Sequence, residues 1–141
     1  MLIKTATLTR SALDWAVAHC QNKVNAGVYG EAVVIEQKLH LHYCDVVLDS
    51  TYDPSTDWSQ GGPIIEREGI EVVRGNNLYF PKGNEKGDHY ESLWLARLPL
   101  MDLEHGYTLH GPTPLIAAMR CFVASKLGDE VDVPDKLMKT T

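Results

Sequence analysis

The stretch HGPTPLIAAMRCFVASKLGDEVDVP, residues 110–134, decides the fold because it predicts one long buried helix. Thr113 suits the N-cap, Pro114 suits the first helical position, where no N–H donor is needed, and Gly128 can adopt the left-handed conformation that ends a helix. Between positions 115 and 127 the only polar side chains are Arg120, Ser125 and Lys126. A helix that is apolar on almost every side belongs in the centre of a domain.

Arg120 is the charge in the middle of this apolar helix. A guanidinium in such surroundings must reach solvent, pair with a carboxylate or bind the anion of a ligand. Structural ion pairs outnumber ligand sites among buried charges, so an ion pair is the favoured interpretation. We expect its partner to be Asp57, Glu66 or Glu68.

A second helix is predicted over residues 10–21, where apolar side chains recur on one helical face. Thr9 suits its N-cap, and Leu8 and Leu13 occupy the two positions of a hydrophobic staple. Cap, staple and periodicity therefore indicate the same helix.

The residues between these helices are rich in β-branched and aromatic side chains, which favour strands. EAVVIE (31–36) and KLHLHYCDVVL (38–48) predict a hairpin, and IEVVRGNNLYFP (70–81) predicts two short strands joined by a turn at Gly75-Asn76-Asn77. LWLARLPLM (93–101) predicts a strand that ends at Pro99. The polar segment 82–92 is predicted to be a loop, and a turn is predicted at His105-Gly106.

Helices at both ends of the chain with strands between them predict an α+β fold. We expect a single domain over residues 1–137, in which an antiparallel sheet from the middle of the chain packs against an N-terminal and a C-terminal helix. Residues 138–141 are expected to form a flexible tail.

The composition limits the class of protein. A chain of 141 residues with 44% hydrophobic residues is sufficient for one domain, and its net charge of −6 argues against duplex nucleic acid as a partner. Its three cysteines, Cys20, Cys44 and Cys121, form no Cys-x-x-Cys pair, which favours free thiols in a reducing compartment. The sequence shows neither an apolar run long enough to span a membrane nor a signal peptide, so we expect a cytoplasmic protein.

Two patterns of reactive residues in the sequence do not complete a metal or catalytic site. His40, His42 and Cys44 alternate along one strand face and are ligand types for zinc or copper, but no fourth ligand is evident, so a solvated sheet face is favoured and no metal or other cofactor is expected. No Gly-x-Ser-x-Gly motif is present, and the apolar surroundings of Cys121 disfavour a thiolate. We therefore assign no catalytic residue and favour a protein that is not an enzyme.

The motif YDPSTDWSQGGPIIEREGIEVV, residues 52–73, is the favoured ligand-binding region. Here and at residues 111–116, glycine and proline precede an aliphatic helix start, which is expected at Pro63 in the first case. Helix N-termini suit anions such as phosphate, an arginine can add donors, and an indole can stack on a base. The predicted ligand-binding residues are Ser55, Thr56, Asp57, Trp58, Gln60, Gly61, Gly62, Arg67, Thr113 and Arg120.

A purely structural interpretation of the same motif is equally supported. In it, Thr56 and Asp57 cap a turn, Trp58 fills the core and Pro63 begins a helix for folding reasons alone.

Three segments of the chain resemble the signature blocks of the NinX-like family of small proteins from tailed phages and prophages. They are LDWAVA, YDPSTDWSQGGPIIEREGI and GPTPLIAAMRCFVASKLGDEVDVPDKL, which together cover somewhat under half of the chain. The chain departs from the family pattern at Asp53, where a smaller residue is usual, and over about 75–110, which is longer here. The resemblance implies a phage accessory protein, carried beside genes that manage the host.

Two functions are therefore expected. The favoured one is a non-catalytic phage accessory protein that binds a small phosphate-bearing nucleotide and so sequesters a host defence signal. The alternative is a host-directed interaction module that binds and redirects a host protein through its apolar and acidic surface. Either function is compatible with a homo-oligomer.

Overall fold

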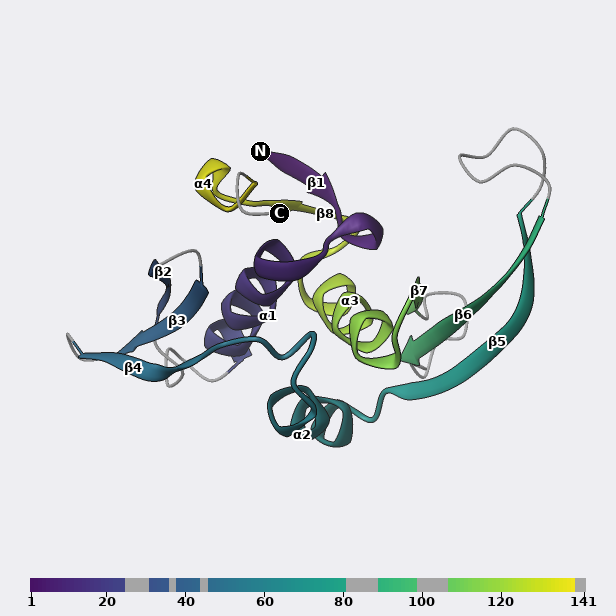
Figure 1. Cartoon of the computed structure of the whole chain (residues 1–141), viewed down its shortest axis with the longest axis horizontal. Coiled ribbons are helices and arrows are strands. Elements are labelled where there is room, and N and C mark those ends of the chain that lie inside the picture. The colour runs from purple at the N-terminus through teal and green to yellow at the C-terminus, as the bar shows by residue number, and fades with distance from the viewer. Residues whose placement is uncertain (25–30, 36–37, 44–45, 81–88, 99–106, 139–141) are drawn as a thin grey trace.

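The computed structural model describes residues 1–24, 31–35, 38–43, 46–80, 89–98 and 107–138, whose arrangement is shown in Figure 1. In chain order the elements are β1 (Leu2–Lys4), the 3-10 helix η1 (Thr5–Thr7), α1 (Arg10–Val24), β2 (Glu31–Ile35), β3 (Lys38–Tyr43), β4 (Val46–Thr51), α2 (Trp58–Glu68), β5 (Glu71–Phe80), β6 (His89–Leu98), β7 (Tyr107–Gly111), α3 (Pro114–Leu127), β8 (Glu130–Asp132) and α4 (Asp135–Met138).

The strands form antiparallel sheets, and the predicted α+β class is confirmed. β2, β3 and β4 pair in chain order, as do β5, β6 and β7, and β1 pairs with β8. The middle of the chain thus forms two sheets where the sequence predicted one, because α2 separates β4 from β5. The first sheet packs on α1 and the second on α3, so the two lie on opposite sides of the helical pair in Figure 1.

The predicted buried helix is α3, and its signals are confirmed. Thr113 is the N-cap, and its Oγ1 accepts a hydrogen bond of 3.1 Å from the backbone N–H of Ile116. Gly128 ends the helix with a φ of 88°, a conformation that favours glycine. Most of the α3 side chains are buried, and α3 contacts α1, α2 and all three strands of the second sheet.

Other predicted elements differ in extent. α1 begins at Arg10 as expected and ends at Val24. The turn predicted at Gly75-Asn76-Asn77 is wrong: β5 continues through it, and one extra residue is accommodated by a shift in pairing register between Gly75 and Leu78. β6 ends at Leu98, immediately before Pro99 as predicted, but it begins at His89, inside the predicted loop.

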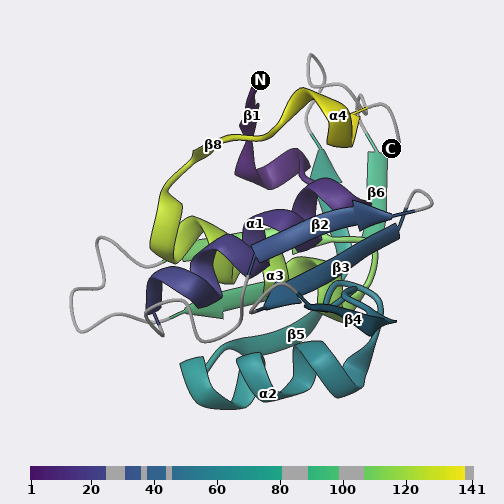
Figure 2. The ribbon, with the colours of Figure 1, turned by 90° about the vertical axis from the view of Figure 1, so that its left-hand side faces the viewer.

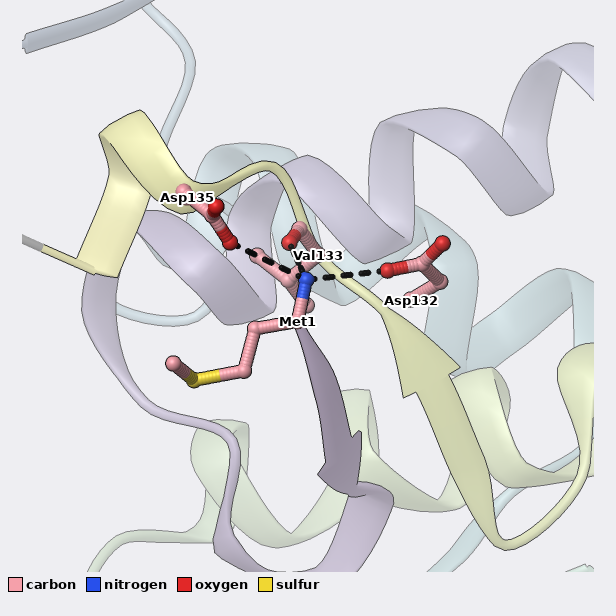
Figure 3. Close-up of polar contacts among 4 residues, drawn as sticks. All are labelled: Met1, Asp132, Val133 and Asp135. Atoms are coloured by element: carbon pink, nitrogen blue, oxygen red, sulfur yellow. Dashed lines mark hydrogen bonds and ion pairs between the residues drawn. The ribbon is translucent and has the colours of Figure 1, made fainter.

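The two ends of the described chain meet beside α1 (Figure 1). β1 pairs with β8, and the amino group of Met1 donates to Asp132 Oδ1 at 3.0 Å, to the Val133 carbonyl oxygen at 2.8 Å and to Asp135 Oδ1 at 3.2 Å (Figure 3). The hydrogen bonds to Asp132 and Asp135 raise the pKa of this amino group. None of these short elements was predicted, and α4 extends to Met138, one residue into the predicted tail.

Several predictions fall outside the described residues. These are the turn at His105-Gly106, residues 139–141, and the side chains of His40, His42 and Cys44. Within the described part of the chain, no helix is both long enough and apolar enough to cross a membrane.

Candidate functional site

The 52–57 turn leads directly into α2, which begins earlier than predicted. Asp57 is the N-cap, and its Oδ1 accepts from the Ser59 backbone N–H at 2.9 Å and from the Ser59 hydroxyl at 2.7 Å. The prediction that Pro63 begins the helix is therefore wrong, because a capping carboxylate starts the helix five residues upstream and Pro63 lies inside it. Gly61 and Gly62 are likewise helical, and Gly69 is the C-cap.

Gln60 joins two carboxylates at this end of α2. Its Nε2 donates to Asp53 Oδ1 at 3.0 Å and to Asp57 Oδ2 at 3.2 Å, and its Oε1 accepts from the Asp53 backbone N–H at 2.9 Å. Hydrogen bonds from Ser59 lower the pKa of Asp57, so this carboxylate is ionised at neutral pH. We call Asp53 and Asp57 the carboxylate pair.

Two polar residues of α1 hold the segment that contains α2. Asp14 Oδ1 accepts from the Ser55 backbone N–H at 2.9 Å just before α2, and Gln21 Oε1 accepts from the Arg67 guanidinium at 2.8 Å near its end. Asp14 and Gln21 are seven residues apart, so they lie on the same side of α1, and both are buried. The segment is therefore attached to α1 at both ends.

The inner side of α2 packs on α3, and the two helices run in the same direction. Gly61 lies against Leu115 in the first turn of α3, Arg67 lies over the Phe122 ring at 5.8 Å, and Glu68 pairs with Lys126 at 3.6 Å. A Cβ on Gly61 would be 2.6 Å from Leu115 Cδ2 and would also meet the backbone of the 52–57 turn, so only glycine fits there.

Arg120 binds backbone carbonyls, and the predicted ion pair with Asp57, Glu66 or Glu68 is wrong. Its Nε donates to the Leu8 carbonyl oxygen at 2.8 Å, and its NH1 donates to the His110 carbonyl oxygen at 2.8 Å. Glu68 instead pairs with Arg67 and Lys126. Desolvation lowers the pKa of the Arg120 guanidinium, which links the segment before α1 to the end of β7.

The structure brings part of the predicted ligand-binding set together and separates the rest. The residues from Ser55 to Gly62 cluster at the start of α2, close to the start of α3, where Thr113 lies exposed. Arg67 is in the last turn of α2, about 13 Å along the axis from Trp58 at 1.5 Å per residue, and not one turn in as predicted. Arg120 is buried beneath α1 and β7.

The geometry of this cluster does not favour a phosphate. The α2 N-terminus is already occupied by the Asp57 carboxylate, and the α3 N-terminus by the Thr113 hydroxyl. An anion at α2 would be repelled by the carboxylate pair. A cavity of about 220 Å³ lies elsewhere, among Lys4, Thr5, Ala6, Leu109, Ala124, Asp129 and Glu130, and includes none of the predicted residues.

The sequence also gave no reason to select Asp14. Burial raises the pKa of its carboxyl to about 7, hydrogen bonding with Ser55 opposes the rise, and the charge of Asp53 adds to it. The Ser55 backbone N–H donates to this carboxyl, whereas the buried Ser55 hydroxyl has no partner in hydrogen-bond geometry among the described residues. The available signal was the seven-residue spacing of Asp14 and Gln21 beside the apolar face of α1.

The family model described as bacteriophage P22 NinX matches residues 4–126. The chain belongs to this NinX family. The match includes the 75–110 segment, α1, α2 and nearly all of α3, so the resemblance read from three separate blocks is confirmed. No curated relative matches the chain.

The reactive side chains of this NinX-family chain comprise the Cys121 thiol and the residue types that bind metal ions. Burial raises the pKa of the Cys121 thiol to about 11, which keeps this thiol protonated at neutral pH and disfavours it as a nucleophile. The described residues include no group of three or more His, Cys, Asp or Glu side chains that could hold a metal ion.

The outer side of α2 differs from its inner side. We call Trp58, Ser59, Gly62, Pro63 and Glu66 the outer face, because their spacing places them on one side of the helix. Trp58 is 56% exposed, so the interpretation in which it fills the core is wrong. A Cβ on Gly62 would meet nothing within 4 Å, so no contact described within the chain requires glycine there. α2 lies at one edge of the molecule in Figures 1 and 2.

Proposed function

We propose that this NinX-family protein is a non-catalytic phage accessory protein that binds a host protein through the outer face of α2. The observation that carries the proposal is the combination, on one helical face, of an exposed indole with a glycine and a proline that the described packing does not require. Tryptophan is enriched among the residues that dominate binding energy in protein interfaces.

Gly62 and Pro63 lower the stability of α2. Glycine in a helix interior is less favourable than alanine by about 1 kcal/mol. Pro63 has no N–H, so the Ser59 carbonyl loses the donor that a helix normally supplies four residues later. Together they leave no side chain at Gly62 and only the proline ring at Pro63 on the α2 surface beside Trp58.

Such a surface suits a protein partner better than a nucleotide. A partner backbone can approach Gly62 closely, and the adjacent indole supplies a rigid contact with little loss of side-chain entropy. The nucleotide hypothesis retains one supporting observation, which is that the exposed Trp58 could stack on a base. The carboxylate pair and the capped helix N-termini weigh against its phosphate.

Site-specific photo-crosslinking in the bacterial host tests the proposal. A benzophenone amino acid at Ser59 is expected to form a discrete adduct with a host protein, and the same group at Val73, which is 55% exposed on β5, is not. Trp58→Ala should abolish the Ser59 adduct without unfolding the protein. Identical adducts from both positions, or an adduct that survives Trp58→Ala, would contradict the proposal.

A nucleotide panel in a thermal-unfolding assay addresses the competing function. A ligand present at 100 times its dissociation constant stabilises the native state by about 2.7 kcal/mol. A nucleotide that raises the melting temperature of the parent protein but not of Trp58→Ala would show that the ligand of this face is a nucleotide and would contradict the protein partner. No change with any member of the panel is the result that we expect.

A further inference from the structure

The start of α2 combines an exposed aromatic ring with two carboxylates that form no ion pair with a described basic side chain. Gln60 holds Asp53 and Asp57 together, and Trp58 follows Asp57 directly. Among the described residues no basic side chain forms an ion pair with either carboxylate. Glu66 adds a further exposed carboxylate to the outer face, two turns along.

The nearest cation of α2 does not neutralise this end. The Arg67 guanidinium is directed to Gln21, Glu68 and the Phe122 ring at the opposite end of the helix. The whole chain carries a net charge of −6, so its wider field also favours an approaching cation.

The carboxylate pair retains capacity to accept hydrogen bonds. Asp57 Oδ1 accepts from Ser59 twice, but among the described residues Asp57 Oδ2 accepts from Gln60 alone, and a carboxylate oxygen has two lone pairs. A planar guanidinium can donate in its plane to such an oxygen while its face stacks on an indole, a geometry that suits arginine better than the compact ammonium of lysine.

We infer that the occupant of the outer face is a basic segment of a host protein whose arginine stacks on Trp58 and donates to the carboxylate pair Asp53 and Asp57. The inference rests on the proposed function and specifies the chemistry of the partner. Charge complementarity selects the arginine, while the bare backbone at Gly62 accommodates the chain on either side of it.

Blocked pentapeptides of sequence Gly-Gly-Arg-Gly-Gly, with lysine or citrulline in the central position as controls, test the inference. Binding is followed by the NMR signal of the Trp58 indole N–H, which the variant Trp58→Phe assigns among the indole signals. The arginine peptide should shift this signal at about tenfold lower concentration than the neutral citrulline peptide, and more strongly than the lysine peptide. Added salt should weaken the effect.

The double variant Asp53→Asn/Asp57→Asn supplies the matched control. Asparagine caps helices as well as aspartate, and its side-chain oxygen can still accept from Ser59 at position 57 and from Gln60 at position 53. The fold should therefore be retained, while both charges and the hydrogen bond from Gln60 to residue 57 are lost. We expect a loss of about tenfold in affinity for the arginine peptide. Equal shifts by arginine and citrulline peptides, no shift by any peptide, or full binding by the double variant would overturn the inference.

The crosslinking experiment distinguishes a failure of this inference from a failure of the proposed function on which it rests. If the double variant keeps the Ser59 adduct and Trp58→Ala loses it, the proposed host-protein interface is supported, and the inference of a basic segment in it is wrong. If neither variant changes the adduct, both are wrong.

Discussion

The two sides of α2 are built from similar residues in different surroundings. Gly61 on the inner side fits against Leu115 and the 52–57 turn, whereas a Cβ added to Gly62 on the outer side would meet no described atom within 4 Å. Arg67 is held by Gln21, while the indole of Trp58 is exposed. The described packing thus explains the inner side, and our proposal assigns the outer face to a partner.

The largest effect on stability is expected at Arg120, which lies on α3. Arg120→Met should destabilise the protein by about 2–4 kcal/mol, because the Leu8 and His110 carbonyl oxygens each lose a buried donor. Urea unfolding measures this loss. A variant as stable as the parent would show that the two hydrogen bonds contribute nothing, and that Arg120 is available for another role.

Gly61→Ala should destabilise by about 2–3 kcal/mol, since the added methyl group meets a backbone carbonyl that cannot move freely. The same unfolding experiment measures it, with Gly62→Ala as the matched control on the adjacent residue. A neutral effect at Gly61 would remove the distinction between the two sides of α2.

Asp14→Asn should change the pH dependence of stability. The native pKa of about 7 lies above the unfolded value of about 3.9, so the native state binds the additional proton, and its stability falls as pH rises between these values. Asparagine still accepts from the Ser55 N–H but carries no charge. We expect the variant to be more stable by about 1–3 kcal/mol at pH 8 and nearly unchanged at pH 4.

Unfolding measured at both pH values checks this prediction. A gain of the same size at pH 4 and pH 8 would mean that the Asp14 carboxyl is not protonated in the native state.

Trp58→Ala should change the free energy of unfolding by less than about 0.5 kcal/mol, because the side chain is mostly exposed. Trp15 is the control of the same residue type: it packs against the core and stacks on His19 with ring centroids 5.3 Å apart. Trp15→Ala should therefore cost several times more. Equal costs at the two positions would place Trp58 in the core after all.

The sequence predicted the elements whose signals are local. The cap, first residue and stop of α3 all lie within the helix or beside it, and the ending of β6 before Pro99 is equally local. The partners of Arg120 were not predictable in this way, because Leu8 is 112 residues distant and offers only a carbonyl oxygen. Every residue has a backbone carbonyl oxygen, so no sequence pattern identifies which one accepts from Arg120.

The start of α2 was mispredicted because two local signals competed. Proline favours the first turn of a helix, which suggested Pro63, but Asp57 offers a stronger start through its hydrogen bonds to Ser59. The pattern therefore places Gly61 and Gly62 before the helix, although both are helical, one as a packing requirement and the other with open space beside it. The assignment of the 55–62 residues as ligand contacts stays a prediction.

The most direct test of the account is Gly62→Ala, examined for unfolding free energy and for the Ser59 crosslink together. Alanine is the better helix former and meets no atom within 4 Å, so the variant should be more stable by about 0.5–1 kcal/mol. The crosslink to the host protein should nevertheless weaken, because the new methyl group stands where the partner approaches. A destabilised variant, or a stabilised one with an undiminished crosslink, would contradict the claim that the outer face of α2 exists for a partner.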